Sequence, residues 1–253
     1  GDLWLGDGDR ARNLTNSEAH ETSPVWDPAT ATVYYASWTD DEHGSVYALR
    51  TQSGEREKLT RIPSQYGSLA LSSDGKTLAY VRGTGGLQRG LWLSNETRFE
   101  LVIRESERER VITTVNGREL QYANFAAKIP PNVLFGPDGQ TVFFTEFVED
   151  VLVLKRIGRD GTDERVLYRF PHAAEAALSP DLQWIAFREY HRSFVTPFQA
   201  AAPAVTVSAF DKQGVTLGVD AEDGGYFSWS RDGRILGWTR AAAFSTVNGS
   251  PDF

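Results

Sequence analysis

Two amino acids are missing from this chain of 253 residues, which contains no cysteine and no methionine. The absence of cysteine excludes disulfides, thiolate catalysis and zinc–thiolate sites together, and it leaves the redox compartment open. A chain of this length carries about five methionines at average usage. Because the initiator methionine is missing as well, we expect a processed or excised piece of a longer protein, and no signal peptide is visible in it.

The chain also lacks a strongly basic stretch and a long apolar run. Its formal net charge is −8, which argues against a nucleic-acid partner. No run approaches the roughly eighteen apolar residues of a membrane-spanning helix, so we expect no membrane span. Apolar residues make up 40% and charged residues 24% of the chain, which is a globular composition. We expect one domain over residues 1–253.

What the chain does contain is a repeated stretch. Residues 71–82 read LSSDGKTLAYVR, and four further stretches align with it without a gap, beginning at Trp26, Phe135, Leu178 and Trp229. Each copy starts with a large apolar residue and carries a β-rich triplet after a turn. Asp can hydrogen-bond its own turn backbone and Gly accepts positive φ, so Asp-Gly between two apolar runs predicts a β-hairpin. The sequence therefore predicts five hairpins.

Two copies depart from this turn chemistry. Ala29 and Thr30 stand in place of Asp-Gly in the first copy, and Leu182 stands in place of Gly in the fourth. We expect these two hairpins to be looser or to have longer turns.

The spacing of the copies predicts the fold class. Their first residues are separated by 45, 64, 43 and 51 residues, and a period in the forties suits a blade of four short strands. We predict an all-β β-propeller of four-stranded blades, with five blades, or six if residues 241–253 form their own strand. Residues 2–15 resemble the outer half of a blade, so N-terminal strands are expected to close the ring. The alternative is a β-sandwich with recurring Asp-Gly turns.

Two segments carry a resemblance to known families. Residues 14–28, LTNSEAHETSPVWDP, and the repeated Ser-x-Asp-Gly hairpins resemble TolB-type propellers, also called WD40-like or PD40 repeats. Residues 158–198, which include EAALSPDLQWIAFREYHRSF, resemble the propeller N-terminal to the metal-dependent barrel of bacterial amidohydrolases. The first resemblance covers nearly the whole chain. It implies a bacterial protein, a periplasmic or secreted location and protein or peptide partners.

No catalytic motif accompanies the resemblance. An amidohydrolase barrel holds its metals with a His-x-His pair, because alternate strand residues point to the same side. None of the four histidines, His20, His43, His172 and His191, has this spacing, and no G-x-S-x-G nucleophile elbow occurs. We expect no cofactor and no metal. If the chain belongs to an enzyme, a metal-dependent amidohydrolase, its catalytic domain lies outside these residues.

Candidate binding residues lie in the loops that enter the inner strands. In a propeller these loops gather at the mouth of the central channel, although they are far apart in sequence. A pocket for a peptide, a small ligand or a cation is one interpretation of them, and an ordinary solvated mouth is the other. The candidates for ligand or partner binding are His20, Glu21, Tyr66, His172, Glu175 and Asp223.

One further segment follows a predicted β run. Tyr190, His191 and Arg192 fit an interface, although a histidine in such a place is more often a hydrogen-bonded structural residue.

Three functions are consistent with the sequence. The first is a non-catalytic TolB-like propeller that binds a protein or peptide or gates a substrate. The second is the accessory propeller of an amidohydrolase-type or other hydrolase. The third is a small-ligand or metal-binding enzyme that uses the channel mouth. The sequence leaves the oligomeric state open.

Overall fold

The computed structural model of the protein describes residues 1–7, 10–83, 98–122, 125–129, 131–200, 203–211, 216–220, 224–240 and 243–248. Within these ranges every regular element is a β-strand, and no helix could span a membrane. The chain divides into two compact units, Gly1–Pro130 and Pro131–Phe253. Each is described by itself, and the single domain over residues 1–253 stays a prediction.

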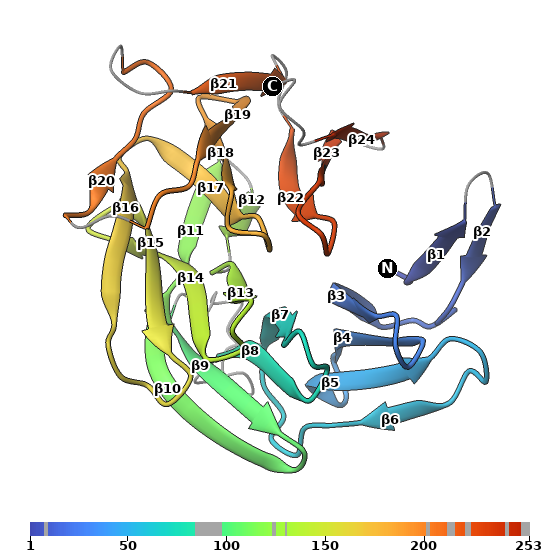
Figure 1. The fold of residues 1–253 in the computed structure, drawn as a ribbon. Helices are drawn as coiled ribbons and strands as arrows, with labels where there is room; N and C mark the ends of the chain where they lie inside the picture. The colour runs from blue at the N-terminus through green and yellow to red at the C-terminus, as the bar shows by residue number, and fades with distance from the viewer. Residues whose placement is uncertain are drawn as a thin grey trace. The chain divides into compact units, whose positions relative to one another are not determined.

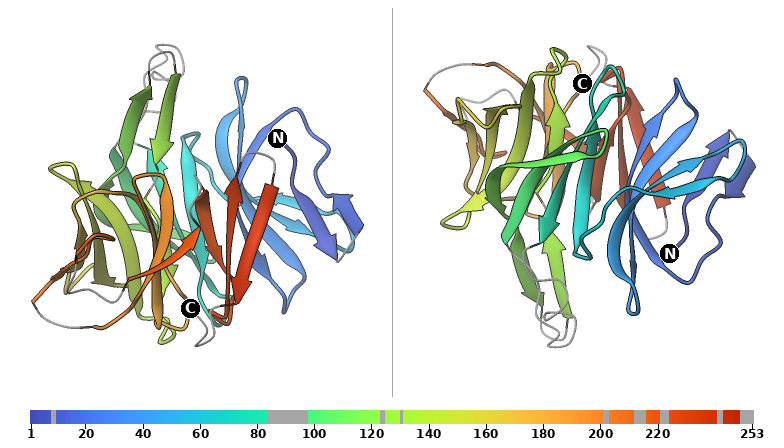
Figure 2. Two further views of the ribbon diagram at one scale, coloured as in Figure 1. Left: turned by 90° about the horizontal axis from the view of Figure 1, so that it is seen from above. Right: turned by 90° about the horizontal axis from the view of Figure 1, so that it is seen from below.

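The described residues of unit 1 form two four-stranded antiparallel sheets and two separate hairpins (Figure 1). The first sheet has the order β3-β4-β5-β6 and the second β10-β9-β8-β7. Figure 2 shows the β11–β12 hairpin extending beyond the ends of the other strands of this unit. The strands are β1 (Trp4–Asp7), β2 (Arg10–Asn13), β3 (His20–Asp27), β4 (Thr32–Thr39), β5 (His43–Arg50), β6 (Arg56–Lys58), β7 (Tyr66–Leu71), β8 (Thr77–Gly83), β9 (Arg98–Glu105), β10 (Arg108–Asn116), β11 (Arg118–Tyr122) and β12 (Phe125–Ile129).

In the part of unit 2 that the structure describes there are three sheets, of five, four and three strands. Their orders are β13-β14-β15-β16-β20, β17-β18-β19-β21 and β22-β23-β24. The strands are β13 (Val133–Phe135), β14 (Thr141–Val148), β15 (Val151–Gly158), β16 (Arg165–Phe170), β17 (Ala173–Leu178), β18 (Trp184–Glu189), β19 (Arg192–Pro197), β20 (Val205–Thr206), β21 (Leu217–Asp220), β22 (Gly225–Trp229), β23 (Ile235–Arg240) and β24 (Ala243–Asn248).

Each of the five repeats forms the first hairpin of one of these five sheets, as predicted for propeller blades. In four copies the amide of the fifth residue donates to the carbonyl of the second, at 2.8 to 2.9 Å. The glycines at this place, Gly75, Gly139 and Gly233, have φ of 71°, 64° and 73°. An L side chain is disfavoured in this conformation, which explains the recurring glycine.

The two departures from the repeat behave differently. Leu182 adopts φ of 57° and keeps the same turn hydrogen bond, from its amide to Ser179 O at 2.9 Å, so the expectation of a looser fourth turn was wrong. In the first copy positive φ falls one residue later, at Ala31 with φ of 51°. Trp26 nevertheless pairs with Val33, the first residue with the eighth as in the other copies, so the expectation of a longer first turn was also wrong. A turn backbone can therefore impose its conformation on a residue that disfavours it.

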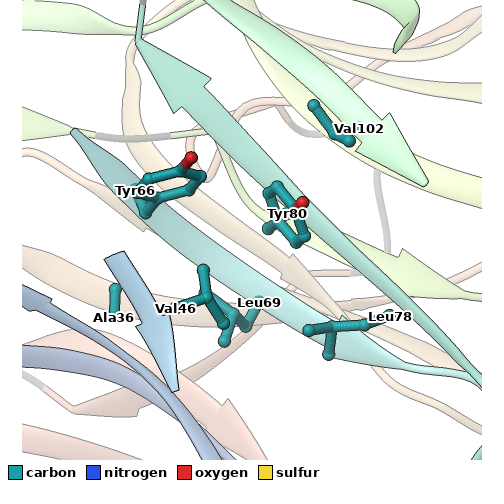
Figure 3. Packing of buried hydrophobic residues seen from close by; sticks show 7 residues of the cluster. All are labelled: Ala36, Val46, Tyr66, Leu69, Leu78, Tyr80 and Val102. Atoms are coloured by element: carbon teal, nitrogen blue, oxygen red, sulfur yellow. The ribbon is translucent and has the colours of Figure 1, made fainter. Parts of the chain in front are cut away.

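The apolar core lies between neighbouring sheets of each unit. Figure 3 shows the cluster in unit 1 formed by Ala36, Val46, Tyr66, Leu69, Leu78, Tyr80 and Val102, which joins the first sheet to the second. In unit 2, Ala177, Ala186, Val195, Phe227, Leu236 and Trp238 join the fourth sheet to the fifth. Because a hairpin cannot bury both of its apolar faces alone, stacking against the next sheet stabilises it.

Two features at the ends of the chain bear on the predicted ring closure. In the described residues β1 pairs only with β2, and β24 occupies the side of β23 on which an N-terminal strand was expected. Closure by the N-terminal strands is therefore not confirmed and stays a prediction. The strand β24 is also the separate C-terminal strand that was considered for residues 241–253.

One strand joins an unexpected sheet. The connection after β19 carries β20 alongside β16, where Tyr168 faces Val205 in a parallel pair (Figure 1), and it returns to β19 as β21. The chain between Pro197 and Leu217 therefore links the third and fourth sheets.

Candidate functional site

The first two candidate residues lie at the start of β3 in unit 1. The carboxylate of Glu21 is buried and accepts hydrogen bonds from the Leu3 amide at 3.2 Å, the Ser17 hydroxyl at 3.0 Å and the Thr15 hydroxyl. These bonds hold the N-terminal segment against the first sheet. His20 is exposed, and its Nδ1 lies 3.4 Å from the terminal amino group of Gly1. Within unit 1, Glu21 thus has a structural role in the fold.

Tyr66, the third candidate, begins β7 and belongs to the core of unit 1. Its side chain is buried, its hydroxyl donates to Ile62 O at 2.6 Å, and its ring meets the edge of Tyr80 at 5.6 Å between centroids (Figure 3). Burial raises the pKa of the hydroxyl. Tyr66 therefore contributes packing between the first two sheets.

In unit 2, Glu175 connects two neighbouring sheets. It lies in β17, and its carboxylate accepts hydrogen bonds from the amides of Tyr226 at 2.9 Å and Phe227 at 2.8 Å, both in β22. Arg188 Nε lies 3.9 Å from the same carboxylate. Burial raises the pKa of Glu175, and the amides of Phe227 and Tyr226 and the charge of Arg188 only partly oppose this shift.

His172 lies just before β17 and is exposed. Its ring stacks on Tyr190, with 5.6 Å between centroids and 30° between the planes. Tyr190 in turn contacts Phe210 at 5.8 Å. We call His172, Tyr190 and Phe210 the aromatic surface. Tyr190 is 60% exposed and Phe210 62%, so this apolar area is left to solvent in unit 2.

The aromatic surface is held by a buried carboxylate. Glu189 has no exposed area and accepts the Ser208 hydroxyl at 2.8 Å and the Ala209 amide at 2.9 Å, which fixes the backbone just before Phe210. Phe210 also contacts Phe194 at 6.4 Å, and Phe194 stacks on the buried Phe187. The exposed rings therefore rest on the core of the fourth sheet instead of on a free loop.

The backbone at Tyr190 forms a tight hairpin turn. Tyr190 and His191 have φ of 47° and 65°, in the turn between β18 and β19. A two-residue hairpin turn of this kind requires positive φ at both residues, and Glu149 and Asp150 form the same turn between β14 and β15, with φ of 49° and 67°. The turn leaves the Tyr190 ring exposed, which makes it a candidate contact site.

The structure brings together some of the predicted site residues and not others. His20, Glu21 and Tyr66 belong to unit 1, and His172 and Glu175 to unit 2, while Asp223 lies outside the described residues. Their convergence at a channel mouth stays a prediction. In the described ranges, no three His, Asp or Glu residues are grouped so that they could hold a metal ion.

Sequence reasoning missed Phe210 and the role of Glu189. The sequence marks the segment around Tyr190 as an interface candidate, but the partner ring of Phe210 lies 20 residues later in the chain. The only signal in the sequence is a charged residue, Glu189, at the end of an apolar strand. Such a residue is rarely fully buried unless it is hydrogen-bonded, so it points to an anchored neighbour.

Comparisons with known proteins concern the fold. No family model and no curated protein sequence matches the chain. Among solved structures, TolB from Acinetobacter baumannii is 18% identical, with 96% of this chain and 55% of that chain covered and a TM-score of 0.69. A chain of the nidogen/laminin complex is 13% identical, with 94% and 80% covered and a TM-score of 0.64. A TolB candidate from Agrobacterium tumefaciens is 14% identical, with 96% and 76% covered and a TM-score of 0.60.

The sheets and these matches together define the class, a β-propeller. Within that class the fold is that of a TolB-like propeller, as the repeats indicated. At these identities the likeness concerns the fold alone, because one fold carries many functions. The chain spans about half, 55%, of the length of the Acinetobacter TolB.

Proposed function

We propose that the chain is a non-catalytic propeller module that binds a protein or peptide partner through the aromatic surface of His172, Tyr190 and Phe210. The exposure of two large rings, 60% and 62%, is the observation that carries this proposal. Aromatic side chains dominate the binding energy of protein interfaces, since they bury a large area with few rotatable bonds.

The arrangement of the rings favours a peptide over a sugar. The planes of Tyr190 and Phe210 are inclined by 54°, and those of Phe194 and Phe210 by 70°. Sugar rings stack best on flat aromatic faces, whereas inclined rings offer both faces and edges to apolar side chains such as proline. The matching chain of the nidogen/laminin complex comes from a protein–protein assembly, which supports a protein partner as well.

The test is selection of a displayed library of random twelve-residue peptides on the wild-type protein, followed by titration of the selected peptides. The variant carries both Tyr190→Ala and Phe210→Ala. Loss of two aromatic contacts should weaken binding by about thirtyfold or more, at about 1 kcal/mol or more for each ring. The control is Phe244→Ala, since Phe244 in β24 is 64% exposed but does not belong to the aromatic surface. Equal affinity of wild type and double variant would contradict the proposal.

The second candidate function is an accessory propeller of a hydrolase, of the amidohydrolase type, that orients or gates the substrate. The segment 158–198, on which that resemblance rests, includes His172 and Tyr190. In that case the partner is a catalytic domain outside these residues. Titration of the chain with a purified amidohydrolase barrel separates the two functions, because only the accessory role predicts binding that Tyr190→Ala weakens.

We also propose a bacterial origin and a periplasmic or secreted location. The support is the TolB-like fold. Fractionation of bacterial cells that express the full gene tests the location, and recovery of the protein only with the cytoplasm would contradict it.

A further inference from the structure

Tyr226 is the most exposed of the large apolar side chains that the structure describes, at 78%. It lies in β22, at an irregularity of the β22–β23 pairing between Gly225 and Ser228, and its φ is 59°. With the described residues its ring makes no ring contact, and its hydroxyl makes no hydrogen bond. A bulky residue is strained in this conformation, so the fold holds Tyr226 in place without using its side chain.

Glu175 holds the backbone at Tyr226. Its two carboxylate oxygens accept hydrogen bonds from the amides of Tyr226 at 2.9 Å and Phe227 at 2.8 Å, so the carboxylate fixes two successive peptide groups. The approach is close, because a Cβ at Gly225 would lie 3.3 Å from Glu175 Oε2. Phe227 is buried in the core between the fourth and fifth sheets. The backbone is therefore anchored on one side by packing and on the other by charge-assisted hydrogen bonds.

The same place in unit 1 is built differently. Ser23 and Ser68 also lie three residues before the first residue of a repeat, at bulges, with φ of 53° and 52°. There the Ser23 hydroxyl accepts the Ser68 amide at 3.0 Å. A small hydroxyl is sufficient to link two sheets at this position. The link between two sheets therefore requires neither an aromatic ring, as at Tyr226, nor a carboxylate, as at Glu175.

We propose that Tyr226 contacts the partner directly and that Glu175 is the residue that positions it. This inference rests on the proposed function and adds one contact residue in the fifth sheet to those in and after the fourth. The ring offers a face to an apolar or proline side chain, and the free hydroxyl can donate to a peptide carbonyl. An extended peptide supplies both groups at short spacing, so it is the ligand that this arrangement fits.

The contact is tested with peptides selected on the wild-type protein from the random twelve-residue library. Tyr226→Ala should weaken binding about fivefold or more, and Tyr226→Phe should weaken it less, because only the hydroxyl is lost. Phe244→Ala, in the same sheet, should leave affinity unchanged. Peptides that bind Tyr226→Ala as tightly as wild type, while losing affinity for the Tyr190→Ala and Phe210→Ala double variant, would overturn this inference alone. Selection of no peptide at all would overturn the proposed function and this inference with it.

The positioning role needs a measurement that a purely structural role would not change. Glu175→Ala should accelerate hydrogen exchange at the amides of Tyr226 and Phe227 and weaken peptide binding about threefold or more. Glu175→Gln keeps one acceptor oxygen and should restore part of the affinity. In a Tyr226→Ala background, Glu175→Ala should have no further effect on affinity, because the side chain that it positions is gone. Additive losses in this double-mutant cycle would refute the positioning role.

Discussion

Gly139 and Gly233 are glycines at the same turn position of two different repeats. Replacing each glycine by alanine separates the free-energy cost of the backbone conformation from the cost of close packing. Gly139 and Gly233 occupy the fifth place of the third and fifth copies, and their φ values are 64° and 73°. A Cβ at Gly139 would meet nothing within 4 Å, whereas a Cβ at Gly233 would lie 2.4 Å from Asp181 Cγ. The two alanine variants therefore differ mainly in their surroundings.

The expected magnitudes follow from this geometry. Alanine in the left-handed region costs about 1 to 2 kcal/mol, and the lower entropy of its unfolded chain offsets about half of that. We therefore expect Gly139→Ala to lower the free energy of unfolding by about 1 kcal/mol. At Gly233 the new methyl group must also displace the Asp181 carboxylate, which accepts the Ser179 hydroxyl at 2.5 Å and the Gln183 amide at 3.1 Å. This displacement adds about 1 to 3 kcal/mol.

Urea unfolding of the two variants and the wild type measures the difference, with the slope m as a check that unfolding remains comparable. In a thermal scan we expect Tm to fall by about 3 °C for Gly139→Ala and by about 8 °C for Gly233→Ala. Equal losses at the two positions would refute the close approach of the fifth repeat to Asp181. Unchanged stability of Gly139→Ala would refute the positive φ itself.

Three further predictions follow from other contacts. Because the folded pKa of Glu175 is raised, its contribution to stability is complete below the ordinary value near 4.5 and is lost as the pH rises through the folded pKa. Glu175→Gln should remove this pH dependence of stability. The Tm of the variant should therefore rise relative to that of the wild type as the pH rises. A Tm difference that is constant with pH would contradict the raised pKa of Glu175. Glu109→Gln should lower the free energy of unfolding by about 2 kcal/mol, since Arg82 and Tyr80 contact its carboxylate at 2.9 and 2.7 Å and Arg82 is only 11% exposed. The control Glu107→Gln removes a solvent-exposed ion pair with Arg61 and should cost less than about 0.5 kcal/mol, so similar losses in urea unfolding would argue against the network. Deletion of residues 2–15 removes Leu3 and Leu14 from the cluster with Val33 and Tyr35 and should lower Tm far more than a surface trim; an unchanged Tm would show that this segment does not stabilise the first sheet.

The repeated hairpins were predictable because their chemistry is local. Asp and Gly define the turn within a few residues, and the recurrence of the pattern gave the number of sheets. The strand β20 was not predictable in this way. It forms a parallel pair of two residues with β16, and Val205 and Thr206 alone carry no pattern that distinguishes a strand from a connection.

The candidate site was predictable only in part, because the sequence gives only the order of its residues in the chain. From that order, the start of an inner strand is expected to be a loop open to solvent. Register shifts in β3 and β7, between Thr22 and Val25 and between Gly67 and Ala70, interrupt the alternation of the strand, and a one-residue slip changes the face of every side chain. Glu21 and Tyr66 are buried near these shifts. No pattern of alternation predicts a bulge before the coordinates are known.

The aromatic surface depends on contacts that are distant in the sequence. The chain first forms β20 in the third sheet. Tyr190 and Phe210 then meet because the Glu189 carboxylate accepts hydrogen bonds from the Ser208 hydroxyl and the Ala209 amide. Sequence reasoning can mark Tyr190 as exposed, but it cannot supply the second ring. The contact between the exposed rings of Tyr190 and Phe210 is therefore visible only in the structure.

Hydrogen–deuterium exchange of the wild-type protein, with and without a saturating selected peptide, locates the proposed binding surface on unit 2. We expect slower exchange in the peptide complex at residues 190–192, 209–211 and 226–227, and no change in the sheets of unit 1. Protection confined to other segments, or no protection at a peptide concentration that saturates binding, would contradict it.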